Sequence, residues 1–120
     1  MCYPASSRTR PDIESEDFFA LENRSRILER EGNRCFYCIR KLSPENYVIE
    51  HVLSRPVGDN GYRNVVASCR HCNNRKGSSV ADDWLRTLYR EGFLDAAAFQ
   101  DRFSHLEQLR AGQLRPAAGR

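Results

Sequence analysis

Two identical cysteine pairs, Cys35-x-x-Cys38 and Cys69-x-x-Cys72, stand out in this 120-residue chain. Each pair puts two thiols on one tight turn, where both can bind the same ion. Together the two turns supply the four sulfur ligands of a tetrahedral zinc site, and a site filled by four thiolates leaves no position for water. The spacing therefore predicts a structural zinc ion, and its binding contributes on the order of 10 kcal/mol to folding.

The alternatives for these cysteines are buried free thiols or two disulfides. The first residues contain no apolar stretch of the length that a secretory signal needs, so we expect a cytoplasmic protein. In a reducing cytosol, two such pairs indicate metal rather than disulfides. Cys2 belongs to neither pair, and its role stays open. His71 lies inside the second pair, but four cysteines already complete the zinc shell, so we expect it to point outward, toward nucleic acid.

Four polar residues between and just after the cysteine pairs have types suited to hydrolysis: Glu50, His51, Asn64 and Asn73. A histidine is largely neutral near pH 7 and can accept a proton from water. A carboxylate and an amide oxygen are ligands that Mg²⁺ accepts. Neighbouring residues of a strand project to opposite sides, so Glu50 and His51 should diverge, with room for a phosphate between base and metal. Each residue also has an ordinary alternative, as a structural histidine, a surface carboxylate or a turn cap.

In their order and spacing, these residues resemble the HNH endonucleases in their four-cysteine form. The resemblance covers roughly residues 26–77. The positions that match the family pattern are Cys35, Cys38, Glu50, His51, Val52, Asn64, Cys69, Cys72, Asn73 and Lys76. So many matches in order are far more specific than any single motif.

The resemblance implies the role of each catalytic residue. His51 would be the general base, and Glu50 and Asn73 would bind a catalytic divalent metal. Asn64 would hold His51 and its loop in place. The resemblance also implies a β-hairpin and helix around that metal, and DNA as the substrate.

The chain departs from the family pattern at three places. Glu50 stands where Asp is more frequent, so its carboxylate reaches further. Asn73 replaces histidine, as in the H-N-N variants, which favours Mg²⁺ or Mn²⁺ over Ni²⁺ or a catalytic Zn²⁺. The loop after the histidine carries Pro56 and separated glycines instead of an early proline and a Gly-Gly pair, which leaves its shape open.

The net charge is only +3 (19 basic minus 16 acidic residues), so the total alone does not identify a nucleic-acid binder. Between residues 55 and 76, however, basic residues outnumber Asp59, the one acid there. With His71, the residues that we expect to contact nucleic acid are Arg55, Arg63, Arg70, Arg75 and Lys76. The alternative is an ordinary solvated face.

Patterning around this core predicts an α+β protein. Apolar residues at helical spacing indicate a helix over roughly 16–31 that ends at Gly32-Asn33. Residues 47–52 are rich in β-branched and aromatic side chains and predict a strand. Ser79 and Asp82 fit a capping box before a helix with an apolar stripe of Trp84, Leu85, Leu88 and Tyr89. A last helix is expected from Asp95 to about Arg110, with Phe99, Phe103, Leu106 and Leu109 facing inward.

The chain is thus expected to be one domain with a small ββα-metal, treble-clef-like core, stapled by zinc and flanked by helices. We expect a flexible segment over residues 1–14, the HNH domain over 15–111 (core about 33–78, C-terminal helices about 79–111) and a flexible tail over 112–120. No apolar run approaches the roughly 18 residues of a membrane span.

Two functions fit these residues: a metal-dependent endonuclease that nicks or cuts DNA, and a non-catalytic zinc-ribbon module that only binds nucleic acid. The cysteines and arginines would suffice for the module, whereas Glu50, His51, Asn64 and Asn73 are needed only by the enzyme. A homodimer, or a larger phage or defence assembly, is a possible context.

Overall fold

The computed structural model describes residues 13–118, so Cys2 and nearly all of the segment expected to be flexible at the start lie outside the described residues. The elements in chain order are η1 (Leu21–Asn23), α2 (Arg24–Arg30), β1 (Val48–His51), β2 (Val65–Ser68), α3 (Arg70–Lys76), α4 (Ala81–Arg90) and α5 (Ala96–Arg110). A β-hairpin followed by helices confirms the α+β prediction. None of the helices in this part of the chain has the length and apolar character that crossing a bilayer requires.

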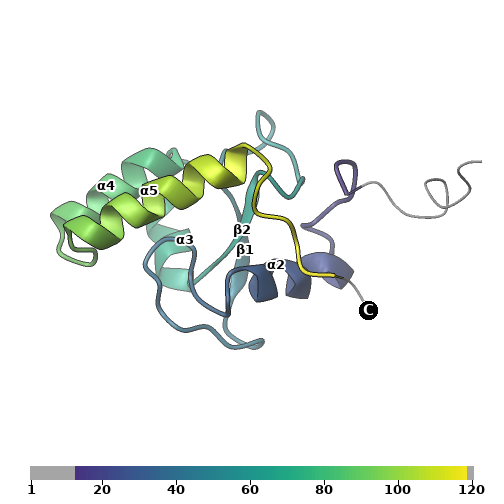
Figure 1. The fold of residues 1–120 in the computed structure, drawn as a ribbon, viewed down its shortest axis with the longest axis horizontal. Helices are drawn as coiled ribbons and strands as arrows, with labels where there is room; N and C mark the ends of the chain where they lie inside the picture. The colour runs from purple at the N-terminus through teal and green to yellow at the C-terminus, as the bar shows by residue number, and fades with distance from the viewer. Residues whose placement is uncertain (1–12, 119–120) are drawn as a thin grey trace, which may run out of the picture.

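The hairpin lies in the middle of the molecule, with α4 and α5 along one side and α2 on the other (Figure 1). β1 and β2 are antiparallel, and the register pairs Val48 with Ser68 and His51 with Val65. Every residue of β2 is buried, and α2 packs against this strand. The hairpin therefore holds His51 at the end of a strand that is anchored in the core.

The first helical region is shorter than the predicted helix over 16–31. The Asp17 carboxylate accepts hydrogen bonds from the backbone amides of Phe19 (2.8 Å) and Ala20 (3.1 Å), which closes a turn instead of a helix. Helical structure begins only at Leu21 and ends, as expected, before Gly32, whose φ of 67° is unfavourable for residues with a Cβ. An aspartate that bonds its own following amides competes with helix formation.

The two C-terminal helices confirm the predicted apolar stripes at most positions. Trp84, Leu85 and Leu88 of α4 are buried, whereas Tyr89 is 46% exposed. In α5, Leu106 and Leu109 are buried, while Phe99 and Phe103 are only partly buried. The Asp95 side chain caps α5 by accepting from the Ala98 amide at 2.8 Å.

The predicted capping box at the start of α4 is wrong. Val80 is the residue before the helix, and no side chain caps it. The Ser79 hydroxyl donates instead to the Lys76 carbonyl at 2.7 Å, and Asp82 forms an ion pair with Arg110 at 2.7 Å. Ser79 thus bonds the end of α3, and Asp82 connects α4 to α5.

Part of the tail expected over 112–120 lies along α2. The Ala117 amide donates to the Arg26 carbonyl at 3.2 Å, and Arg26 Nε donates to the Ala117 carbonyl at 2.8 Å. Arg30 donates to the Leu114 carbonyl at 3.2 Å. Hydrogen bonds with the backbone and the arginine side chains of α2, which composition does not reveal, hold this segment as far as Ala117.

Candidate active site and zinc centre

The four predicted zinc ligands come together. The sulfur atoms of Cys35, Cys38, Cys69 and Cys72 all lie within 4.8 Å of one another, and those of Cys38 and Cys69 are 3.7 Å apart. A tetrahedron with Zn–S bonds of about 2.3 Å has an edge of roughly 3.8 Å, so the cluster fits zinc. No other group of three or more such ligands occurs within residues 13–118.

Electrostatics within the cluster also favour a bound cation. Hydrogen bonds from the thiols of Cys35 and Cys72 lower the pKa of Cys38 to about 4. Hydrogen bonds with Cys35 and Cys38, together with burial, raise the pKa of Cys72 far above its usual value. Four thiols this close cannot all ionise without a positive charge between them, and a metal ion supplies that charge.

His51 ends β1 and is partly exposed. Its Nε2 lies 2.8 Å from Oδ1 of Asn60, within hydrogen-bond distance. The imidazole also stacks on the Phe19 ring, with centroids 4.6 Å apart and planes inclined by 21°. The ring of His51 is therefore held by residues of two other segments while part of it stays accessible.

Glu50 projects away from His51, as strand geometry predicts, and is 4% exposed. Its Oε2 accepts from the Tyr37 hydroxyl at 2.7 Å, and its Oε1 lies 3.2 Å from the Lys76 ammonium. Burial raises the pKa of the Glu50 carboxyl, and Lys76 opposes that shift. Burial and the nearby carboxylate also hold the pKa of Tyr37 well above its usual value.

Lys76 differs from the expectation that it contacts phosphate. Its side chain is fully buried, and its ammonium donates to the His51 carbonyl at 3.1 Å as well as pairing with Glu50. A buried carboxylate is stable only beside a compensating charge, which explains why Lys76 turns inward. The Glu50–Lys76 ion pair therefore connects α3 to β1, and Glu50 is the chain neighbour of His51.

Whether these residues suit a divalent ion depends on Glu50 and Asn73. Their oxygen donors are of the kind that Mg²⁺ prefers. Asn73 lies in the first turn of α3, is partly exposed, and its side chain makes no hydrogen bond within the described residues. The donor chemistry fits, but an ion at Glu50 would have to share the carboxylate with the Lys76 ammonium or displace it.

Asn64 fastens the connection between the strands. Its Oδ1 accepts from the Leu53 amide at 2.8 Å, and its Nδ2 donates to the carbonyls of Leu53 (3.0 Å) and Asp59 (2.9 Å). Gly58 passes so close that a Cβ there would lie 1.9 Å from the Leu53 carbonyl oxygen. Asn64 therefore holds the loop, and the hydrogen-bond partner of the His51 ring is Asn60.

A scan against protein-family models matches residues 35–79 to the model described as HNH endonuclease. Over residues 35–79, the chain is therefore similar to the HNH endonucleases. The Septu protein PtuB of Bacillus thuringiensis is 37% identical over 57 residues, covering 43% of this chain and 22% of that protein. The chain thus spans about a fifth of the length of this curated relative.

A solved structure shares the fold of nearly the whole chain. The Type II-C Cas9 enzyme from Actinomyces naeslundii superimposes with a TM-score of 0.54 over 95% of this chain and 13% of that enzyme. Their sequences are 20% identical, so this likeness concerns the fold. It extends beyond residues 35–79 to the flanking helices.

The other residues expected to contact nucleic acid fall into three groups, which differ in exposure and in their partners. Arg55 and Arg70 are exposed and form no ion pair within residues 13–118. Arg63 and Arg75 are exposed but pair with Glu14 and Glu91, respectively. His71 does not point outward as expected: it is partly buried, and its ring packs against Phe93 and Trp84.

The sequence does not predict three contacts of His51 and Glu50, namely those with Phe19, Tyr37 and Asn60. Tyr37 lies inside a cysteine turn, where its spacing to Glu50 carries no signal. Phe19 and Asn60 come from segments outside any motif, and only the fold brings them to His51.

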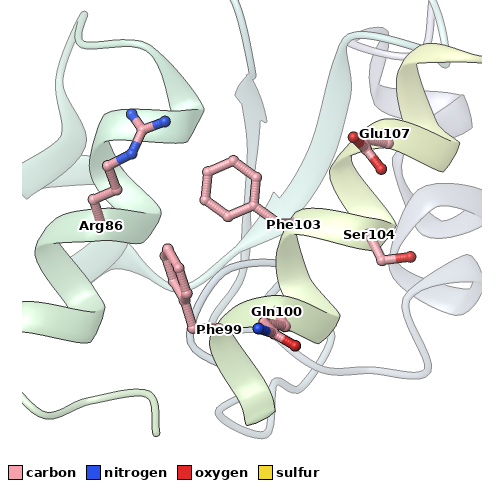
Figure 2. Close-up of a pocket in the computed structure, with 6 residues that line it drawn as sticks. All are labelled: Arg86, Phe99, Gln100, Phe103, Ser104 and Glu107. Atoms are coloured by element: carbon pink, nitrogen blue, oxygen red, sulfur yellow. The ribbon is translucent and has the colours of Figure 1, made fainter. Parts of the chain in front are cut away.

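One hollow on the surface is unrelated to this chemistry. A cavity of about 380 Å³ lies between α4 and α5 and contains none of the predicted site residues. Figure 2 shows Arg86 facing Phe99 and Phe103 across it. Its lining residues are Arg86, Phe99, Gln100, Phe103, Ser104 and Glu107.

Proposed function

We propose that this protein is a metal-dependent HNH endonuclease that hydrolyses DNA phosphodiester bonds, with His51 as the general base. The observation that carries the proposal is the state of His51 within residues 35–79, which match the family model. Its ring is partly exposed and is gripped by a hydrogen bond and an aromatic stack. A histidine kept only for stability would be expected to pack fully into the core.

His51 would take the proton from the attacking water. A neutral imidazole can do this because one of its ring nitrogens has a free lone pair that accepts a proton. The two cysteine turns and the hydrogen bond from Lys76 to the His51 carbonyl hold the end of β1. The His51 ring therefore does not need to be ordered when substrate binds.

A catalytic Mg²⁺ or Mn²⁺ would be held by Glu50 and Asn73. Such an ion stabilises the negative charge that develops on the phosphate and its leaving oxygen. The chain's own contribution is a carboxylate already oriented by Tyr37, with Lys76 as the group that must yield. Arg55 and Arg70 are exposed and make no ion pair within residues 13–118, so they are available for phosphate contact, whereas Arg63 and Arg75 would first have to leave their acidic partners.

The competing function is a zinc-ribbon module that binds nucleic acid without cutting it. A plasmid-nicking assay with Mg²⁺ or Mn²⁺ separates the two. We expect nicking by the wild type and a loss of about 100-fold or more in His51→Ala, since general-base catalysis contributes at least this factor. The matched control is His105→Ala, because His105 is a partly exposed histidine of α5 that does not belong to the proposed site. This variant should retain wild-type activity. A wild type that binds DNA but stays inert with both metals would support the module.

The setting in which the enzyme works is part of the proposal. A single site of this kind makes a nick, so a double-strand break would require a homodimer or a larger assembly. The similar Septu protein PtuB is much longer than the matched region, which supports a unit that works within a larger protein or assembly.

A further inference from the structure

We propose that Asn60 is a positioning residue that keeps His51 in the Nε2–H tautomer and leaves Nδ1 as the atom that accepts the proton. The inference rests on the proposed function, because it specifies how His51 is prepared as a base. It assigns a role to a residue outside the HNH motif.

The argument begins with hydrogen-bond chemistry. Oδ1 of Asn60 lies 2.8 Å from Nε2 of His51. An amide oxygen can only accept a hydrogen bond, and a neutral imidazole carries one N–H. Nε2 must therefore carry the hydrogen, and the lone pair available to a water molecule is on Nδ1.

The backbone on both sides of Asn60 is fixed, so its side chain does not drift. The Asn60 carbonyl accepts from the Phe18 amide at 2.8 Å. On one side Asn64 Nδ2 donates to the Asp59 carbonyl at 2.9 Å, and on the other the Asn64 amide donates to the Gly61 carbonyl at 3.0 Å. Asn64, the motif residue expected to support His51, thus acts through Asn60.

Phe19 sets the plane of the imidazole. The two rings stack with centroids 4.6 Å apart. Phe19 is itself held by Arg24, whose guanidinium lies 4.7 Å from the ring centroid and whose Nε donates to the Phe19 carbonyl at 2.8 Å. The hydrogen bond to Asn60 and this stack together determine both the plane and the rotation of the His51 ring.

The structural and positioning roles of Asn60 use different atoms. Its backbone carbonyl joins the loop to Phe18, and its side chain alone meets His51. A side-chain substitution therefore removes the contact to His51 and leaves the backbone bond in place. Asn60→Asp keeps an accepting oxygen at the same position, whereas Asn60→Ala removes it.

The first test is the tautomer of His51, measured by ¹⁵N NMR of the imidazole in the zinc-loaded full chain at about pH 8. We expect the Nε2–H form in the wild type and in Asn60→Asp, and a mixture of both tautomers in Asn60→Ala. Asn46→Ala is the matched control, because the exposed Asn46 side chain accepts only from the Ser43 amide. A wild-type Nδ1–H tautomer, or one unchanged by Asn60→Ala, would overturn the inference.

The second test is DNA nicking by the same variants. Asn60→Ala should lower kcat about 10- to 100-fold with little change in KM, the size of effect that a misplaced catalytic group produces. Asn60→Asp should recover most of this loss, and Asn46→Ala should lose nothing. Full kcat in Asn60→Ala would refute the positioning role. The tautomer is measured without substrate, so the expected NMR result in an inactive wild type would instead refute the nuclease proposal.

Discussion

Glu50 and Lys76 show how a single buried pair supports the residue beside it. Both side chains are almost completely shielded from water, and Lys76 also bonds the carbonyl of His51. Removing one member of a buried ion pair leaves the other charge uncompensated, which is far more costly than removing both. The pair therefore matters for stability before any metal or substrate is considered.

The first prediction concerns the cost of breaking that pair. Lys76→Met should lower the free energy of unfolding by about 3 to 5 kcal/mol, because it leaves a buried carboxylate without a cation. The double variant Lys76→Met/Glu50→Gln should recover most of that loss. Urea unfolding of the zinc-loaded proteins measures both, and a double variant no more stable than the single one would contradict the assignment.

The pH dependence of the same variant follows from the pKa of Glu50. Burial raises the pKa of Glu50 in the folded protein above its value in the unfolded chain, so folding takes up a proton at this carboxyl group. The contribution of Glu50 to stability is therefore most favourable below the unfolded pKa, and it falls as the pH rises through the folded pKa. Lys76→Met removes the opposing charge and raises the folded pKa further. The stability cost of Lys76→Met should therefore be smaller at pH 6 than at pH 8. A cost independent of pH would mean that folding takes up no proton at Glu50 in the variant, which would contradict a raised pKa.

Metal binding at Glu50 has a separate signature. If a divalent ion competes with the Lys76 ammonium, Mg²⁺ should raise the Tm of Lys76→Met by more than it raises that of the wild type. Differential scanning calorimetry with and without Mg²⁺ compares the two. Equal shifts would place the ion elsewhere.

At the scale of elements, the connection between β1 and β2 depends on Asn64 and Gly58. Asn64 makes three hydrogen bonds to the backbone of the loop, and Gly58 leaves no space for a side chain. The sequence leaves the shape of this loop open, because the loop lacks the usual early proline and glycine pair. In the structure, Gly58 stands where the loop passes close to the backbone of Leu53.

Gly58→Ala should consequently lower the free energy of unfolding by about 2 kcal/mol or more, because its Cβ would meet the Leu53 backbone. Gly61→Ala is the matched control, since the nearest atom to its Cβ would be a side-chain oxygen of Asp59 at 3.2 Å. Denaturant titration should find Gly61→Ala much milder. Equal effects of the two substitutions would contradict the close approach at Gly58.

Elements were predictable wherever a local pattern decided them. Spacing placed the four cysteines, β-branched residues placed β1, and periodicity placed α4 and α5. The first helix was predicted too long because the Asp17 carboxylate competes for the amides that follow it. The partners of His51 and Glu50 could not be predicted, because each comes from a segment whose contact depends on the folded path of the chain.

For the molecule as a whole, a zinc ion at the four cysteines would join the turn at Cys35–Cys38 to the start of α3, with the hairpin between them. Since the hairpin carries His51, the metal ought to govern both folding and activity. We expect one zinc per chain, and chelation should abolish the tertiary near-ultraviolet circular dichroism and the nicking together. Cys72→Ser should behave like the chelated protein, and a chelated chain that keeps its tertiary signal would contradict a structural role for the ion.

Chemical rescue of His51→Gly is the most direct measurement of the central claim. If the imidazole of His51 takes the proton from water, this variant should nick plasmid DNA at least about 100-fold more slowly than the wild type. Free imidazole should restore part of the rate, rising with its concentration, in the presence of Mg²⁺ or Mn²⁺. A His51→Gly variant that nicks at the wild-type rate without imidazole would contradict the account.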